Sequence, residues 1–463
     1  MLKKFIGNKV FYKKVMMLVL PIMLQNAITN VVSMVDNIMV GTIGTEQMSA
    51  VAIVNQLLYV FNLAIFGIVC GVGIFTAQYF GKNDDDGIRE TIRLKLISAT
   101  VILAIAMLIF IFAGSTLISS YLHESTEPID LALAFSEAKR YLSIMLIGLF
   151  PFMISQVYGS TLREVERPII PMVSGFIAVF VNLLFNYLLI FGHLGFPRLG
   201  ISGAAIATVI SRFVECIVIV LACHIKRRDF TFIKNLYSNF FVSAGMVKRV
   251  MPKALPLLAN EVCWSCGIAL LNNAYALRGV EVVAATNITS TISNVFSVSL
   301  IAFGNAISII VGGLLGARKR EEAIDTNRKM TFLYFVITVV MSGVLMLFAP
   351  VFPQIYNTGE NVRNLATSFI ICYAIYTPFS ALMNAFYFAI RSGGKTIITF
   401  ILDSVYMLCV TVPFTFVLSK FTDINIVPLY ALSLAIEIFK VILGFYLVSK
   451  GTWAQSVLDE KVS

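Results

Sequence analysis

The sequence predicts an all-α integral membrane protein with twelve transmembrane helices in two pseudo-symmetric six-helix lobes. Hydrophobic residues make up 58% of the 463 residues and charged residues only 13%, which is about half the share of about 25% usual in soluble domains. Apolar runs long enough to cross the hydrocarbon core as helices recur along nearly the whole chain. The second half of the chain also repeats the first. A soluble fold of this length could not bury so much apolar surface, so the bilayer is the expected solvent.

The individual spans are delimited by Gly, Pro and charged residues, which interrupt the apolar runs at about 20-residue intervals. Several runs exceed the minimum crossing length, which predicts helices that tilt or extend into water. The predicted spans cover residues 14–40, 50–80, 91–113, 138–161, 168–191, 199–224, 252–277, 282–315, 327–350, 364–390, 396–419 and 427–449.

The distribution of basic residues predicts the orientation of these spans. Most of the 35 Lys and Arg residues fall at the two termini and in the even-numbered connections, and Lys95 is counted with them. By the positive-inside rule, both termini are expected in the cytoplasm, with the chain in the plasma membrane of a bacterial-type cell. The net charge of +10 is therefore assigned to orientation, and no nucleic-acid partner is expected.

An internal duplication fixes the predicted architecture. A shift of 235 residues aligns Pro21 with Pro256 and Gly81 with Gly316, and a shift of 228 aligns the segment that begins at Leu162 with the one that begins at Ile390. Six helices per unit make the two copies parallel in the membrane, with a cavity at their interface. We expect an N-lobe at 1–224, a polar, mobile cytoplasmic linker at 225–251 and a C-lobe at 252–463. Transport would then occur by alternating access of the two lobes.

The sequence argues against an enzyme. The three His residues fall in connections between spans, and no His or carboxylate cluster has the spacing of a metal site or a nucleophile. The seven Cys residues all lie in apolar segments, where they form neither a disulfide framework nor a zinc site. No cofactor is expected.

Ionisable residues inside the predicted spans are the candidate functional residues, because such a group costs a few kcal/mol in hydrocarbon. Asp36 lies about 33 Å of helix beyond Lys14, in the outer half of the first span. Asn182 and Asn186 share one helix face at a comparable depth, and Thr208 is within reach. One carboxylate, two amide oxygens and a hydroxyl suit Na⁺, while the carboxylate alone could bind H⁺ or be a hydrogen-bonded structural group.

The chain resembles the multidrug and toxic compound extrusion (MATE) family from about residue 10 to about residue 450. The resemblance is carried by the duplication, Pro21 and the motifs Val35-Asp36-Asn37-Ile38-Met39-Val40-Gly41, Gly44 and Ser49-Ala50-Val51-Ala52. It implies export of a cytosolic drug or toxic metabolite in exchange for external Na⁺ or H⁺. The family's N-lobe ion site joins a helix 1 aspartate to polar residues of helices 5 and 6, so it implies a site at Asp36, Asn182, Asn186 and Thr208. Some members have a second acid where this chain has Asn186, which leaves the coupling ion open.

A second candidate site lies in the predicted C-lobe. Glu261, about 12 Å into the seventh span, resembles a helix 7 glutamate that some MATE members use for the cation. Those members pair it with a helix 10 acid, where this sequence has Ser380 and Asn384, and Asp403 on helix 11 could take that place. We expect ion coupling or substrate contact at Glu261 and Asp403, with a structural role as the alternative.

Two further charge pairs have opposite signs in the two lobes. Arg212 and Glu215 are three residues apart, as are Glu437 and Lys440, and a shift of 225 superposes the pairs with their signs reversed. Each pair can neutralise itself along its own helix. The alternative is an inner gate between Arg212 and Glu437.

The predicted function is therefore a secondary antiporter that exports organic cations or amphipathic compounds, with Na⁺ or H⁺ as the coupling ion. We expect a monomer whose partners are small molecules and the lipid bilayer. The alternative is a flippase for lipid-linked oligosaccharides or lipids from the same wider superfamily, which would be expected to line its cavity with several basic residues.

Overall fold

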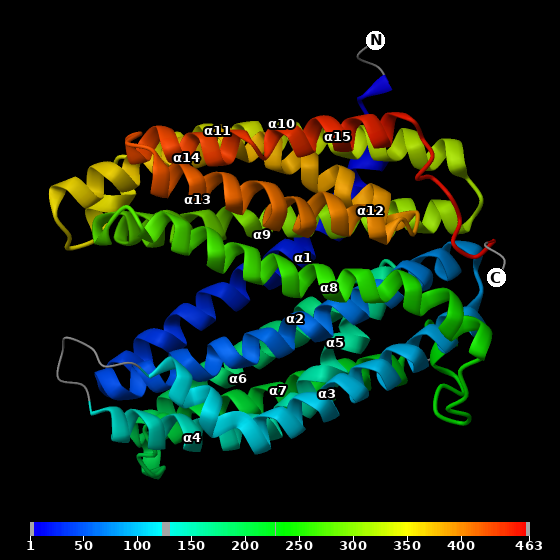
Figure 1. The fold of residues 1–463 in the computed structure, drawn as a ribbon. Helices are drawn as coiled ribbons and strands as arrows, with labels where there is room; N and C mark the ends of the chain where they lie inside the picture. The colour runs from blue at the N-terminus through cyan, green and yellow to red at the C-terminus, as the bar shows by residue number, and fades with distance from the viewer. Residues whose placement is uncertain (1–3, 123–129, 227, 460–463) are drawn as a thin grey trace. The chain divides into compact units, whose positions relative to one another are not determined.

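The computed structural model describes residues 4–122, 130–226 and 228–459, and the regular structure in these ranges is helical (Figure 1). The first half contains α1 (Lys9–Gly41), α2 (Thr45–Lys82), α3 (Asp85–Tyr121), α4 (Leu131–Ile147), α5 (Leu149–Glu164), α6 (Ile169–Phe191), η2 (His193–Gly195), α7 (Ile201–Ile225) and η3 (Thr231–Ile233). The second half contains α8 (Ala244–Ala276), α9 (Val280–Gly316), α10 (Arg320–Phe348), η4 (Phe352–Ile355), α11 (Glu360–Ser392), α12 (Thr396–Phe400), the π-helical segments η5 (Ile401–Val405) and η6 (Met407–Thr411), α13 (Val412–Phe421), α14 (Ile426–Ala435) and α15 (Ile438–Ser449).

The helices match the predicted spans. Within the described ranges, 11 helical stretches are long and apolar enough to cross a membrane, and the pair α4 and α5, bent by 47°, brings the number to 12 if it counts as one span. The bend lies at Gly148, just before Pro151. Because proline lacks an N–H and its ring clashes with the carbonyl four residues earlier, Pro151 accounts for the bend.

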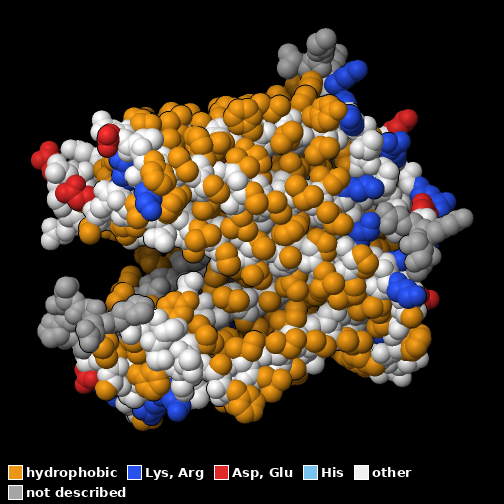
Figure 2. Space-filling model, in the orientation of Figure 1, with side chains coloured by type: hydrophobic (Ala, Val, Ile, Leu, Met, Phe, Trp, Pro, Cys, Tyr) orange, Lys and Arg blue, Asp and Glu red, His pale blue; other side chains and the backbone are white. Residues whose placement is uncertain are grey.

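The helix surfaces are apolar where a soluble protein would be charged. Figure 2 shows hydrophobic side chains over most of the visible helix surface, with charged side chains gathered near the helix ends. Phe112 on α3 is 80% exposed, Phe180 on α6 is 68% exposed and Leu347 on α10 is 77% exposed. Such exposure is favourable only against lipid, where the backbone groups are satisfied within each helix.

The chain divides into two compact units, which are described separately. The N-lobe unit consists of Leu24–Thr76 and Asp85–Lys248, and the C-lobe unit of Met1–Met23, Ala77–Asp84 and Arg249–Ser463. Helices α1 and α2 therefore contribute to both units, a feature absent from the expected division at 224 and 252. That three-part division stays a prediction.

Helices α2 and α9 are equivalent in the duplication and are the most enclosed of the spans. In the most apolar stretch of α2 61% of the residues are buried, and in that of α9 72%, against 39% or less in the other single spans. The equivalent glycines Gly81 and Gly316 allow the end of α2 to touch α9. A Cβ at Gly81 would lie 1.8 Å from the Gly313 carbonyl oxygen, and one at Gly316 would lie 1.9 Å from the Gln78 carbonyl oxygen. Small residues are thus required where the two backbones meet.

The segment after α15 packs back on the C-lobe unit beside the end of α2. Trp453 and Val457 are 2% and 1% exposed. The buried Gln78 side chain donates to the Ser392 carbonyl at 2.9 Å and accepts from the Val457 N–H at 2.9 Å and from the Ser456 hydroxyl at 3.1 Å. The end of α2 is therefore fixed to the C-lobe unit through side-chain as well as backbone contacts.

The linker at 225–251, which was expected to be mobile, contacts the N-lobe unit along α3. Arg93 donates to the carbonyls of Asn235 at 2.8 Å and Leu236 at 2.9 Å, and Glu90 accepts the Ser243 N–H at 2.6 Å. Polar composition predicts mobility, but backbone carbonyls of this segment accept hydrogen bonds from a basic side chain of α3.

Candidate functional site

The four residues predicted for the N-lobe site lie together in the N-lobe unit. Asp36 comes from α1, Asn182 and Asn186 from α6, and Thr208 from α7. The Asn186 amide nitrogen donates to Asp36 Oδ1 at 2.5 Å. With its amide oriented to satisfy the carboxylate, Asn182 donates to both Asp36 oxygens at 2.9 and 3.1 Å. Thr208 Oγ1 lies 3.3 Å from the Asn182 amide.

Helix packing explains why these side chains meet. Asn182 and Asn186 are four residues apart, so both project from the same face of α6. After the left-handed Gly192 ends α6, α7 returns directly against it, and a Cβ at Gly203 would lie 2.6 Å from the Leu189 backbone. This close approach places Thr208 beside Asn182. The sequence thus builds the site with two amides on one helix and a glycine on the next.

The N-lobe site contains one acceptor that has no partner. Asn186 is 1% exposed, and its Oδ1 is buried without a hydrogen-bond partner among the described residues. Within the same ranges, Asp36 forms no ion pair, and its carboxylate is held by amide N–H groups. An unpaired buried acceptor carries a desolvation cost that a bound cation or a donated proton would relieve. Carboxylate, amide and hydroxyl oxygens are also the ligands that hard cations prefer.

The C-lobe candidates Glu261 and Asp403 are brought into one region of the C-lobe unit. The Asn260 amide nitrogen, next to Glu261 on α8, donates to Asp403 Oδ2 at 3.0 Å. Ser404 donates to the Asn260 side chain and carbonyl, each at 2.8 Å. Asp403 and Arg391 both lie within electrostatic range of Glu261. The two acids are therefore linked through Asn260, with a cation nearby.

Asp403 lies in an irregular part of the eleventh span. The π-helical segments η5 and η6 precede Pro413, which lacks the N–H that would continue the α-helical pattern. π-Helical turns often occur at functional sites, because they displace side chains from their regular positions. Here the wide turns carry Asp403.

The twelfth span is also irregular, and its break faces the π-helical segments. Helices α14 and α15 are separated at Ile436 and Glu437. Tyr406 donates to the Ile436 carbonyl at 2.8 Å, and Thr411 donates to the Glu437 carboxylate. Lys440 Nζ donates to the Asp403 carbonyl at 3.3 Å. Polar contacts thus connect the two irregular turns.

Of the two charge pairs predicted along single helices, one forms a close ion pair and the other has only a longer-range electrostatic interaction. Lys440 and Glu437 form an ion pair at 2.6 Å. Arg212 and Glu215 are within electrostatic range, while the Arg212 guanidinium lies 5.0 Å from the centre of the Phe152 ring and one of its nitrogens is buried without a hydrogen-bond partner in the described ranges. The gate between Arg212 and Glu437 stays a prediction.

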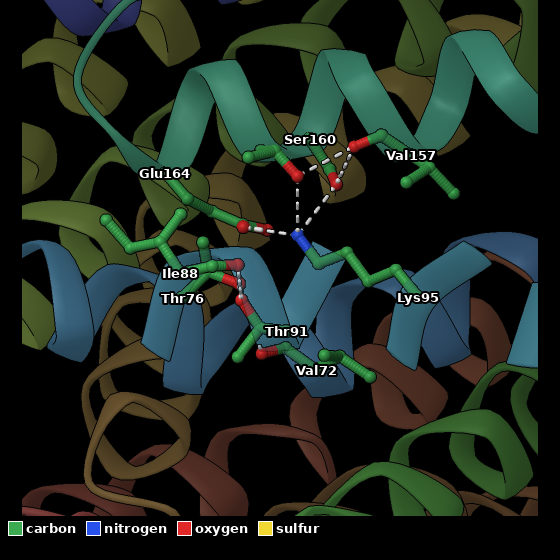
Figure 3. A network of polar contacts seen from close by, with 9 residues as sticks. Val72, Thr76, Ile88, Thr91, Lys95, Val157, Ser160 and Glu164 are labelled. Atoms are coloured by element: carbon green, nitrogen blue, oxygen red, sulfur yellow. Dashed lines mark hydrogen bonds and ion pairs between the residues drawn. The ribbon is translucent and has the colours of Figure 1, made fainter. Parts of the chain in front are cut away.

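One buried charge pair escaped the sequence analysis. The prediction that Lys95 belongs to a connection is wrong, because Lys95 is a fully buried residue of α3 that pairs with Glu164 at the end of α5 (Figure 3). Its Nζ also donates to Ser160 Oγ at 3.1 Å and Thr161 Oγ1 at 3.2 Å. The signal was present, because position 95 falls inside the predicted span 91–113.

The chain is similar to known proteins over most of its length. The family model described as MatE matches residues 21–188 and 256–417. The chain is 23% identical over 445 residues to the probable multidrug resistance protein NorM of Thermotoga maritima, covering 95% of this chain and 93% of that protein. It is 22% identical over 416 residues to the protein of the same description from Bacillus cereus, covering 89% of each.

Solved structures share the fold. A MATE crystal structure in complex with MaL6 superposes with a TM-score of 0.85 at 19% identity and 97% coverage of both chains. An outward-facing multidrug resistance MATE transporter of the MOP superfamily gives a TM-score of 0.84 at 20% identity, again with 97% coverage of both chains. The predicted membrane fold and the family resemblance are confirmed. The chain belongs to the multidrug and toxic compound extrusion (MATE) family, whose members are membrane transporters and not enzymes.

Proposed function

We propose that this protein exports organic cations and related amphipathic compounds in exchange for Na⁺ or H⁺, with Asp36 as the acid that couples the two movements. The observation that supports this proposal is the Asp36 carboxylate, which has no ion pair in the described part of the chain and lies beside the unpartnered Asn186 Oδ1. A buried carboxylate needs compensation, and an exchangeable ion supplies it. Alternating access of the two lobes would connect ion binding to cargo release.

The amide orientations indicate what each ion would change. Asn186 directs an N–H group at Asp36, and Asn182 does the same when its amide is oriented to satisfy the carboxylate. In that orientation a bound Na⁺, which needs oxygen ligands, would require both amides to rotate. A proton on Asp36 would instead let the carboxyl donate, and Asn186 Oδ1 is the acceptor without a partner. The Asn182→Ala variant should therefore impair Na⁺-driven transport more than H⁺-driven transport.

The C-lobe acids Glu261 and Asp403 are proposed as the second functional region, for cation coupling or substrate contact. Their proximity supports a shared role, since Asp403 lies within electrostatic range of Glu261 and accepts a hydrogen bond at 3.0 Å from Asn260, the sequence neighbour of Glu261. We also propose that the protein acts as a monomer in the cell membrane, with both termini in the cytoplasm. Reporter fusions at both termini test the orientation, and mass measurement in nanodiscs tests the monomer.

The main experiment uses purified protein in liposomes, with ethidium as the cargo and an imposed Na⁺ or H⁺ gradient. Asp36→Asn should abolish gradient-driven ethidium movement while the protein still elutes as one peak in gel filtration. Asp325→Asn is the matched control, because Asp325 pairs with Lys329 at 2.5 Å on a partly exposed helix face. Unchanged ethidium extrusion by Asp36→Asn would reject the coupling site. Gradient-independent movement of a fluorescent lipid, without ethidium transport, would favour the flippase.

A further inference from the structure

A mixed charge cluster lies where the π-helical turns of the eleventh span face the break in the twelfth. It consists of Asp403, Glu437 and Lys440, which we call the C-lobe triad. Lys440 forms its ion pair with Glu437 at 2.6 Å and donates to the Asp403 carbonyl at 3.3 Å. It also lies within electrostatic range of the Asp403 carboxylate. One ammonium group therefore interacts electrostatically with two carboxylates.

Lys440 is the most buried residue of the triad. The Lys440 side chain is 5% exposed and packs against the Tyr406 ring at 5.1 Å, whereas the Glu437 side chain is 15% exposed and Asp403 is partly exposed. The Glu437 side chain is thus somewhat more exposed than the ammonium group that pairs with it.

Two other ionisable groups lie near the triad in the described part of the chain. Glu261 on α8 lies within electrostatic range of Asp403, and Arg391 on α11 lies within electrostatic range of Glu261. Glu261 and Arg391 are of opposite sign. The triad itself has two carboxylates and one ammonium group, and with both carboxylates ionised its net charge is one negative charge.

The N-lobe acid has a different environment. Asp36 is held by amides and has no ion pair in the described ranges, so nothing fixed limits the charge of what binds there. The N-lobe counterpart of Glu437 and Lys440, the pair Arg212 and Glu215, has its signs in reverse order along the chain. The duplicated fold therefore does not itself require a lysine beside an aspartate.

We infer that Lys440 is a specificity-determining residue that limits the C-lobe triad to one net negative charge and thereby selects monovalent over divalent organic cations. The inference rests on the proposed function, since it assigns the C-lobe acids to the cargo. A monovalent cation needs one uncompensated carboxylate, which the triad offers. The second positive charge of a divalent cation meets the ammonium group instead of a free carboxylate, and like charges in a partly desolvated site repel strongly. Lys440 thus provides selectivity by weakening the binding of divalent cations and not by strengthening the binding of monovalent ones.

Ethidium and propidium make a matched pair of probes, because they share a fluorescent ring system and carry one and two positive charges. Binding of each to the purified full-length protein is followed by fluorescence polarisation. Lys440→Met raises the triad to two negative charges and should increase the affinity for propidium relative to ethidium about tenfold or more. Lys440→Arg keeps the charge and should keep the wild-type ratio. Glu437→Gln with Lys440→Met restores one negative charge and should restore that ratio.

A further variant keeps the test valid if Lys440→Met fails to fold. Asp403→Asn leaves the ion pair between Lys440 and Glu437 intact but removes the remaining negative charge, so ethidium affinity should fall about tenfold. An unchanged ethidium affinity in Asp403→Asn, or a propidium preference that is the same in wild type and Lys440→Met, would overturn the inference. Failure of wild type to bind or transport either cation would instead count against the proposed function itself.

Discussion

Replacing Lys95 by Met will leave the Glu164 carboxylate buried without its cation, which makes this pair the sharpest test of the N-lobe packing. The Lys95 side chain is fully buried and that of Glu164 is 10% exposed. Removing one partner of a buried ion pair costs about 3–5 kcal/mol, because the other charge remains uncompensated. We expect Lys95→Met to lower the free energy of unfolding by about that amount. This is a large share of the roughly 5–15 kcal/mol that stabilises a typical domain.

The second lobe indicates what removal of both charges will do. The duplication aligns Lys95 with Met330 and Glu164 with Ser392. Met330 and Ser392 are both fully buried, so the same fold packs an uncharged pair at this place. Replacing a buried ion pair by uncharged groups of similar size is often neutral. The double variant Lys95→Met with Glu164→Gln should therefore recover most of the stability that Lys95→Met loses.

The measurement is reversible unfolding in mixed micelles with an increasing fraction of SDS, followed by far-UV circular dichroism. Lys319→Met is the control, because Lys319 and Glu322 are 3.3 Å apart with side chains 59% and 56% exposed. An exposed pair of this kind contributes about 0–1 kcal/mol. The reasoning is refuted if Lys95→Met unfolds like the control, or if the double variant is as unstable as Lys95→Met alone.

Three other changes test the packing around the ends of α2 and α3. Gly81→Ala places a methyl group against the Gly313 carbonyl and should cost about 1–3 kcal/mol in the same unfolding assay. Gly343→Ala is the control and should be neutral or stabilising, because a Cβ there meets nothing within 4 Å. Equal effects of the two variants would contradict the close approach of α2 and α9. Gln78→Ala removes the side-chain contacts that join α2 to α11 and the C-terminal segment, and a loss below about 1 kcal/mol would show that these bonds are dispensable. Arg93→Gln should speed tryptic cleavage in the linker, because the side chain holds linker carbonyls at 2.8 and 2.9 Å, and an unchanged cleavage rate would show that other contacts fix this segment.

The N-lobe site could be predicted because depth along a helix follows directly from sequence. Each residue adds about 1.5 Å, so Asp36 and the face shared by Asn182 and Asn186 could be assigned to one level before any helix was placed. The contact of 2.5 Å between Asp36 and Asn186 agrees with that reasoning. Packing of α6 on α7 at Gly203 then brings in Thr208.

The C-lobe arrangement could not be predicted in the same way. Spacing fixes which residues share a helix face, but not how far each helix is rotated toward its neighbours. The π-helical turns rotate the face that carries Asp403, and hydrophobic periodicity does not distinguish them from a regular helix in an apolar span. Asp403 accepts hydrogen bonds from Asn260 at its carboxylate and from Lys440 at its backbone carbonyl. Depth along a helix does not predict such a contact with a residue on the last span.

Duplication gave the two lobes the same helices. The different functions proposed for them therefore depend on the side chains in which they differ. In the N-lobe, the Asp36 carboxylate has no ion pair among the described residues, and the amides around it can present either N–H groups or oxygens. In the C-lobe, Lys440 already balances one of the two triad carboxylates and stays in place. A site whose charge is free to change suits a small ion that must be released in every cycle. A site whose charge is held constant suits cargo that must be selected by its own charge. The proposed coupling at Asp36 and the proposed selectivity at the C-lobe triad therefore both depend on Lys440, which pairs with an acid in the C-lobe and has no equivalent beside Asp36 among the described residues.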